Sequence, residues 1–211
     1  MQKIAILLDK ENNWLEKFIP LDLYQMKNFS FEVFHNHEEI SSFEFVFVLG
    51  YTKILKKDFL SRNKMVMIVH ESDLPKGKGF SPIQWQILEG KNKITICLIQ
   101  AREKIDSGEI LEKEKLIFDG SELYDEIRES QARVSFDLIK KFLKKYPKIS
   151  KELQNGKSTY YRRRTKEDSE LDVNASIKEN FSKLRIGNNE EWPSFFKLNG
   201  STYILKIYKK N

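Results

Sequence analysis

The chain of 211 residues contains one cysteine, Cys97, and only three histidines. A single thiol forms neither a disulfide within the chain nor a thiolate metal site, and Cys97 lies in an apolar run, so we expect a small buried residue there. No apolar stretch reaches the roughly 18 residues that a membrane span needs. The N-terminus Met1-Gln-Lys-Ile leads directly into a strand-like segment, which argues against a signal peptide. These absences indicate a cytoplasmic protein with no membrane partner.

The composition predicts a folded chain with an uneven charge. Hydrophobic residues make up 40% and aromatic residues 12%, which is enough for a core. The net charge of +6 lies entirely in the last third, because residues 1–147 hold 23 basic and 23 acidic side chains while residues 148–211 hold 14 and 8. We therefore expect a main domain over residues 1–150 and a C-terminal extension over residues 151–211.

Hydrophobic periodicity alternates between strand and helix. Apolar runs predict strands at 3–8, 30–34, 43–49, 65–69 and 94–99. Helical patterns lie at 12–26 (interrupted near Pro20), 54–62, 81–88 and 121–146. This order predicts an α/β fold with a doubly wound, mostly parallel sheet. In the extension we expect a helix near 175–184 and a hairpin, 194–198 with 202–208, around Asn199-Gly200, giving a small α+β appendage.

His70 stands at the carboxyl end of an expected strand, before a loop rich in proline and glycine. Open α/β sheets bind ligands at that edge. Asp106 follows another apolar run, 36 residues after His70, and we expect it to return to the same edge. A histidine beside a carboxylate transfers protons near neutral pH. The alternatives are a structural histidine and an aspartate that caps a turn with Gly108.

The residues around this pair resemble the 10-formyltetrahydrofolate-dependent formyltransferases. The signature of that family is roughly Asn-x-His-x-Ser-x-Leu-Pro, a basic loop with glycine and proline, and then Asp-x-Gly. The matching residues here are His70, Ser72, Leu74-Pro75, Gly79, Pro82, Gly90 and Asp106-Ser-Gly108. The segments 50–55 and 161–168 also resemble family segments, so the likeness runs from about residue 1 to about residue 190. It implies a Rossmann-like formyltransferase fold and N10-formyltetrahydrofolate as formyl donor, with no metal.

One position departs from the signature. The family's asparagine, two residues before the histidine, is Ile68 here. The missing amide would stabilise an oxyanion, and one such donor is typically worth about 10²–10³ in rate. Asn63, Asn36 and backbone N–H groups are the candidate substitutes. A non-catalytic relative that binds folate or a nucleotide therefore remains an alternative.

The resemblance implies a role for each matching residue. His70 and Asp106 are expected to be catalytic, with His70 moving the proton and Asp106 holding it. The expected folate-binding residues are Gly50, Tyr51, Thr52, Ile54 and Asp106. The expected acceptor-binding residues are Ser72, Lys76, Lys78, Trp85, Tyr161, Arg162, Arg163 and Arg164. The alternatives are that Ser72 shapes its loop, that Trp85 fills the core and that the arginines are a solvated surface.

The acceptor is expected to be the amine of a nucleotide-linked amino sugar, in cell-surface glycan biosynthesis. Three guanidinium groups beside two tyrosines suit phosphates and a base. The resemblance to sugar N-formyltransferases rests on Trp85, three residues after Pro82, and on the short extension, which argues against tRNA as partner. A methionyl-tRNA formyltransferase relative is the rival enzyme. The sequence does not identify the sugar or the nucleotide, nor does it distinguish a monomer from a homodimer.

Overall fold

The computed structural model describes residues 1–10 and 13–210. In this part of the chain a central sheet of six strands has the order β2-β1-β3-β4-β6-β7. The four strands β2, β1, β3 and β4 are parallel, while β6 and β7 are antiparallel to their neighbours. The bounds are β1 (Gln2–Leu8), β2 (Phe29–Phe34), β3 (Phe45–Leu49), β4 (Met65–His70), β6 (Lys93–Gln100) and β7 (Ile110–Ile117). The expected α/β fold with a mostly parallel sheet is confirmed.

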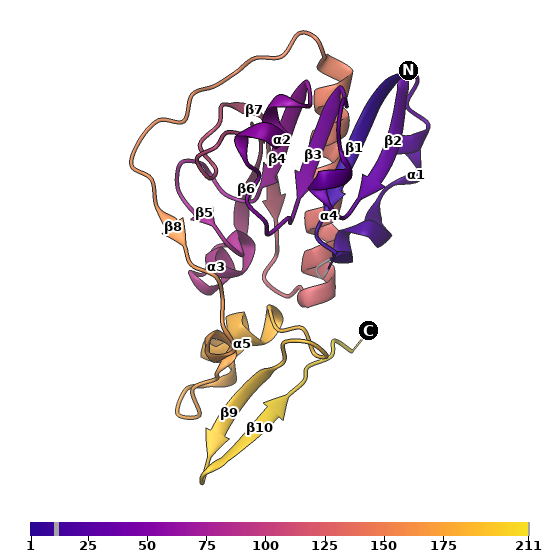
Figure 1. The fold of residues 1–211 in the computed structure, drawn as a ribbon. Helices are drawn as coiled ribbons and strands as arrows, with labels where there is room; N and C mark the ends of the chain where they lie inside the picture. Colours follow the sequence, from indigo (N-terminus) through magenta and orange to yellow (C-terminus); the bar gives the residue numbers. More distant parts are fainter. Residues whose placement is uncertain (11–12, 211) are drawn as a thin grey trace.

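Helices lie on both faces of the sheet, with the long helix α4 along one of them (Figure 1). The helical elements are η1 (Asn13–Phe18), α1 (Leu21–Tyr24), η2 (His37–Glu39), α2 (Lys57–Ser61), α3 (Pro82–Leu88), α4 (Tyr124–Lys145), η3 (Lys166–Ser169) and α5 (Ile177–Arg185). Two short pairs complete the fold: β5 (Lys78–Gly79) with β8 (Tyr160–Tyr161), and β9 (Ser194–Leu198) with β10 (Ser201–Leu205).

The two faces of strand β3 contact the two layers of the core. All five of its residues are buried, as expected for a strand covered on both faces. Phe45 and Phe47 pack edge-on against Phe142 of α4, at 5.6 and 5.8 Å between ring centroids. Val46 and Val48 belong to the opposite layer, which contains Phe59 of α2.

Several elements differ from the sequence expectation at their ends. The segment expected as a helix over 12–26 is a 3₁₀ helix followed by a single turn, α1; Asn12 lies outside the described residues. Helix α2 starts at Lys57 instead of Ile54, and α4 starts at Tyr124 instead of Ser121 because a hydrogen-bonded turn occupies 119–122. Strand β7 was not predicted, because charged residues interrupt its apolar pattern.

The segment after α4 runs along the outside of the sheet to β8, and α5, β9 and β10 lie beyond the carboxyl ends of the parallel strands (Figure 1). Among the described residues, no helix is long and apolar enough to cross a membrane. Cys97 is fully buried, as expected, and burial raises the pKa of its thiol to about 11.

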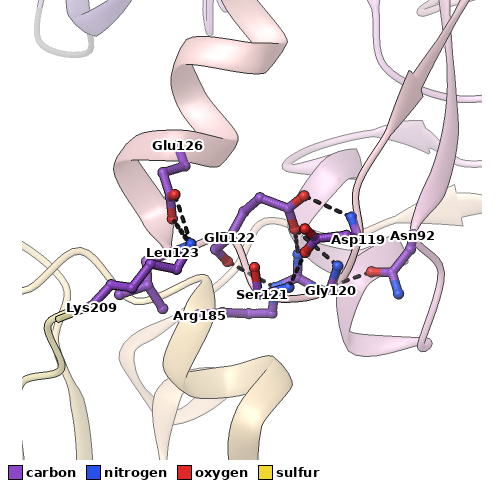
Figure 2. A network of polar contacts seen from close by, with 9 residues as sticks. All are labelled: Asn92, Asp119, Gly120, Ser121, Glu122, Leu123, Glu126, Arg185 and Lys209. Atoms are coloured by element: carbon purple, nitrogen blue, oxygen red, sulfur yellow. Dashed lines mark hydrogen bonds and ion pairs between the residues drawn. The ribbon is translucent and has the colours of Figure 1, made fainter. Parts of the chain in front are cut away.

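Arg185 fastens α5 to the turn that precedes α4 (Figure 2). Its side chain is 4% exposed and donates to the backbone oxygen and to Oε2 of Glu122, at 3.0 and 2.7 Å, and to Asn92 at 2.8 Å. Glu122 in turn accepts from the N–H groups of Asp119 and Gly120. One buried guanidinium thus joins α5 to two segments of the main sheet region.

We expect Arg185→Met to destabilise the protein by about 2–4 kcal/mol, because it removes three hydrogen bonds and leaves Glu122 without its cation. Urea unfolding measures this difference. Lys209→Met is the matched control: Lys209 pairs with Glu126 in the same network (Figure 2), but both side chains are at least 40% exposed. It should cost less than about 1 kcal/mol. Equal effects of the two variants would contradict the anchoring role of Arg185.

Candidate active site

His70 ends β4 and is 5% exposed. Its Nε2 lies 2.9 Å from the backbone oxygen of Gly77. A carbonyl oxygen only accepts, so Nε2 carries a proton in this contact. The other ring nitrogen, Nδ1, lies 3.6 Å from Oδ2 of Asp106. Nδ1 is therefore the ring nitrogen that faces the carboxylate.

Asp106 reaches His70 by a route that the sequence did not suggest. Because β6 runs antiparallel to β4, Cys97 lies level with His70, and Gln100 lies level with Met67. The chain thus leaves β6 toward the amino end of β4, and residues 101–109 fold back to bring Asp106 to His70. The expected proximity of Asp106 and His70 is present, although the strand that precedes Asp106 is not parallel to β4.

The returning loop is held by close backbone contacts. Asp106 adopts a left-handed backbone with φ of 47°, and its Oδ2 accepts from the Gly79 N–H at 2.9 Å. The side chain of Gln154 donates to the backbone oxygens of Asp106 and Gly108 at 2.9 and 2.8 Å. A Cβ on Gly108 would lie 1.6 Å from the backbone oxygen of Gln100, so only glycine fits there.

A cavity of about 250 Å³ opens beside the pair. Its wall includes His70 and all the residues expected to bind folate: Gly50, Tyr51, Thr52, Ile54 and Asp106. The loop that carries four of them is fixed to the end of β1, because the N–H and the hydroxyl of Thr52 both donate to Asp9. Tyr51 is held by His37, whose Nδ1 lies 2.8 Å from the phenol oxygen.

Ile68 also lines this cavity, two residues before His70 and on the same side of β4. Neither asparagine considered as a substitute is near it. Asn63 precedes β4 at the opposite end of the strand, and its amide is bonded to the backbone of Phe43 and Phe59. Asn36 caps η2 by accepting from Glu38. Neither residue lines the cavity, so the prediction that one of them replaces the missing amide as an oxyanion donor is wrong.

The eight residues expected to bind the acceptor do not line the cavity. Lys76 is exposed on the loop, whereas Lys78 and Ser72 are buried. Trp85, Tyr161 and Arg162 form a stack: the two rings lie 6.2 Å apart, and the guanidinium lies 4.7 Å from the Trp85 ring. This stack joins α3 to the segment after β8.

The three arginines Arg162–Arg164 mostly contact other residues of the chain. Arg162 forms a two-point contact with Asp168, and Arg163 lies over the ring of Phe80 at 4.7 Å. Arg164 is partly buried and donates to Ser169 at 3.1 Å. The three guanidiniums therefore do not form one open phosphate site.

The residues on the opposite wall of the cavity were not predicted as site residues. Residues that line it include Trp14, Glu71, Gln84, Arg128 and Gln131. Glu71 accepts from Gln131 at 2.6 Å, and Gln131 accepts from Arg128 at 2.9 Å. Arg128 and Gln131 lie on one face of α4, three residues apart. Only the packing of α4 on the sheet brings them beside residue 71.

Comparison with known proteins identifies the family. The family described as "Formyl transferase" matches residues 3–138. The chain belongs to this family. Its residues are 31% identical, over 90% of this chain and 61% of the relative, to a methionyl-tRNA formyltransferase of Fusobacterium nucleatum. The methionyl-tRNA formyltransferase of Finegoldia magna is 27% identical over 92% of this chain and 63% of its own length. The chain thus spans less than two thirds of these relatives.

Solved structures share the fold. A methionyl-tRNA formyltransferase from Clostridium thermocellum has a TM-score of 0.80 at 22% identity, covering 100% of this chain and 94% of that one. A 4-N formyltransferase from Francisella tularensis has a TM-score of 0.76 at 16% identity, covering 100% and 98%. HypX from Aquifex aeolicus in complex with tetrahydrofolic acid has a TM-score of 0.75 at 14% identity, covering 97% and 37%.

We expect Gly108→Ala to destabilise the protein and to separate Asp106 from His70, because the backbone must move to clear the Gln100 oxygen. Gly90→Ala is the control, since Gly90 has a positive φ of 81° but nothing within 4 Å of its Cβ position. The control should cost about 1 kcal/mol of unfolding free energy from backbone strain alone. Thermal unfolding of both variants measures the difference, and equal losses would contradict the close-contact role of Gly108.

Proposed function

We propose that this protein transfers a formyl group from N10-formyltetrahydrofolate to the amine of a nucleotide-linked amino sugar. The observation that carries the proposal is the buried His70–Asp106 pair on a cavity whose wall holds the residues that the family resemblance assigns to folate. Family membership supports formyl transfer itself. The choice of an amino sugar is supported by structural likeness to a sugar N-formyltransferase from a Shewanella species and by the cavity wall on the α4 side.

The folate side of the cavity offers apolar side chains to the face of a flat ring. Ile54 and Ile105 line the cavity and remain 66% and 49% exposed, which is unusual for isoleucine and suits a ligand that covers them. In this proposal the donor lies between the 50–55 loop and the 101–106 return. When bound, it supplies the formyl carbon. The likeness to a HypX structure that contains tetrahydrofolic acid supports a folate as the donor.

His70 is the proton carrier in this mechanism. The acceptor amine loses a proton as it forms a bond to the formyl carbon, and the departing nitrogen gains one as its bond breaks. Nδ1 of His70 takes and returns that proton, while Nε2 stays fixed on Gly77. Asp106, at 3.6 Å, stabilises the positive imidazolium and keeps the ring in place.

A tRNA acceptor is the second candidate, because the sequence relatives described above are methionyl-tRNA formyltransferases. In the proposed division, residues 1–150 are the catalytic domain and residues 151–211 an extension that supports it through Arg185. Incubating the protein with N10-formyltetrahydrofolate and either nucleotide amino sugars or methionyl-tRNA, with mass spectrometry of the products, decides between the acceptors. Strongly salt-dependent tRNA binding would also favour the second.

We expect His70→Asn to lower the rate of formyl transfer by about 10²–10⁴, because the proton carrier is lost. Tetrahydrofolate affinity should stay within about tenfold, since the folate wall is unchanged. Steady-state kinetics and calorimetric titration measure the two quantities. His35→Asn is the matched control, because the Nε2 of His35 lies 3.3 Å from Glu16 and His35 is not among the residues that line the cavity. Near-normal turnover of His70→Asn would remove His70 from the mechanism.

We expect Ile68→Asn to increase turnover, because it places an amide beside His70 where the family signature has one. An amide left unpaired there would cost about 1–3 kcal/mol of stability, so folding is measured in the same sample. Ile68→Val, which adds no polar group, is the control. A folded Ile68→Asn protein no faster than the parent would show that other groups already stabilise the oxyanion.

A further inference from the structure

We propose that Arg128 binds a phosphate group of the formyl acceptor, in the part of the cavity that faces α4. This inference rests on the proposed function and assigns the anionic end of its acceptor to a residue outside the Arg162–Arg164 triplet. The acceptor class is then a primary amine that carries a phosphate or diphosphate within the same small molecule.

The cavity extends around the carboxyl edge of the sheet and has two sides. His70, Asp106 and the 50–55 loop belong to the side of α2, and Glu71, Gln131 and Arg128 belong to the side of α4. Folate in the proposed position occupies the first side. The acceptor, which must meet the formyl carbon beside His70, then extends into the second.

Arg128 is positioned as a fixed cation on that second side. Its guanidinium lies 4.4 Å from the centre of the Trp14 ring and 5.0 Å from that of Tyr124. Nη1 donates to Gln131, whose own amide is fixed by Glu71. This arrangement holds the guanidinium rigid, so little conformational entropy is lost when it binds an anion.

No carboxylate contacts Arg128 directly. Within residues 1–10 and 13–210 its guanidinium forms no ion pair: Nη1 donates to Gln131, Nη2 lies 3.0 Å from the side-chain oxygen of Gln84 in the amide orientation that satisfies both groups, and Nε is buried without an acceptor. A buried N–H without a partner is costly, and an oxygen of a ligand would satisfy it.

Arg164 adds a second positive charge nearby. Its Nε is also buried without an acceptor among the described residues. Burial lowers the pKa of its guanidinium, with Asp168 opposing that shift and Arg128 reinforcing it. Asp168 is already bonded to Arg162, so the group of three arginines and one aspartate keeps an excess of positive charge. Arg164 does not line the cavity, so it adds positive potential beside Arg128 without contacting the ligand.

The test is calorimetric titration of the full chain with inorganic pyrophosphate and, separately, with tetrahydrofolate. We expect the parent protein to bind both ligands. Arg128→Met should weaken pyrophosphate binding about 10- to 100-fold, the usual worth of a charge-assisted hydrogen bond, and leave tetrahydrofolate binding unchanged. Arg133→Met is the matched control: Arg133 is exposed on the same helix, and its loss changes the net charge equally. It should stay within about twofold of the parent.

A purely structural role for Arg128 would lower the melting temperature without changing pyrophosphate affinity, and that result overturns the inference. It is also overturned if the parent binds tetrahydrofolate but not pyrophosphate, or if Arg128→Met affects only the binding of tRNA. If Arg128→Met does not fold, Arg128→Lys keeps the charge but loses the planar fork and should bind pyrophosphate at least about threefold more weakly. A parent protein that fails to bind tetrahydrofolate contradicts the proposed function, whereas the pyrophosphate comparison still decides the role of Arg128.

Discussion

The contact between Asp106 and His70 depends on the loop that returns from β6 to the carboxyl end of β4. Three separate segments hold this loop: Gly108 lies against the Gln100 backbone, Gln154 bonds two of its carbonyl groups, and Gly79 donates to the Asp106 carboxylate. The Gly79 bond also joins the loop 76–79 to the His70–Asp106 pair, because Gly77 of that loop accepts from His70. The relative positions of His70, Asp106 and this loop are therefore set together by the fold, as preorganised catalysis by the pair would require.

The two sides of the cavity differ in how their charges are balanced. On the folate side, Arg102 lines the wall but bonds Glu109 at 2.9 and 2.8 Å. On the α4 side, Arg128 lines the wall and meets an amide, not a carboxylate. A cation that is already paired gains little from a second anion, whereas an unpaired one in a partly buried site gains much more. This difference favours an anionic group on the α4 side and a largely neutral ring on the other.

The sequence predicted those features that depend on local pattern. Strand periodicity located the parallel strands, and the prediction that His70 stands at a strand end, within reach of Asp106, agrees with the structure. The arginine triplet shows why the rest was not predictable. Three adjacent guanidiniums indicate a phosphate site in isolation, but Arg162 is bonded to Asp168 and lies over Trp85, 77 residues away in sequence. Arg128 was not predicted as a site residue, because a polar residue on an amphipathic helix is ordinarily solvated. Only tertiary packing places it on the cavity wall.

Ile68 supplies no polar group at the position where the family signature has an asparagine. Its side chain packs against two buried clusters, one of which contains Ile99, and contributes no hydrogen bond to the cavity. His70 follows on the same side of β4, so its imidazole is the first polar group beyond this apolar surface. Both of its ring nitrogens already have partners, since Nε2 lies against the Gly77 oxygen and Nδ1 faces Asp106. In the proposed mechanism, backbone N–H groups are therefore the candidate donors to the oxyanion in place of the family's asparagine.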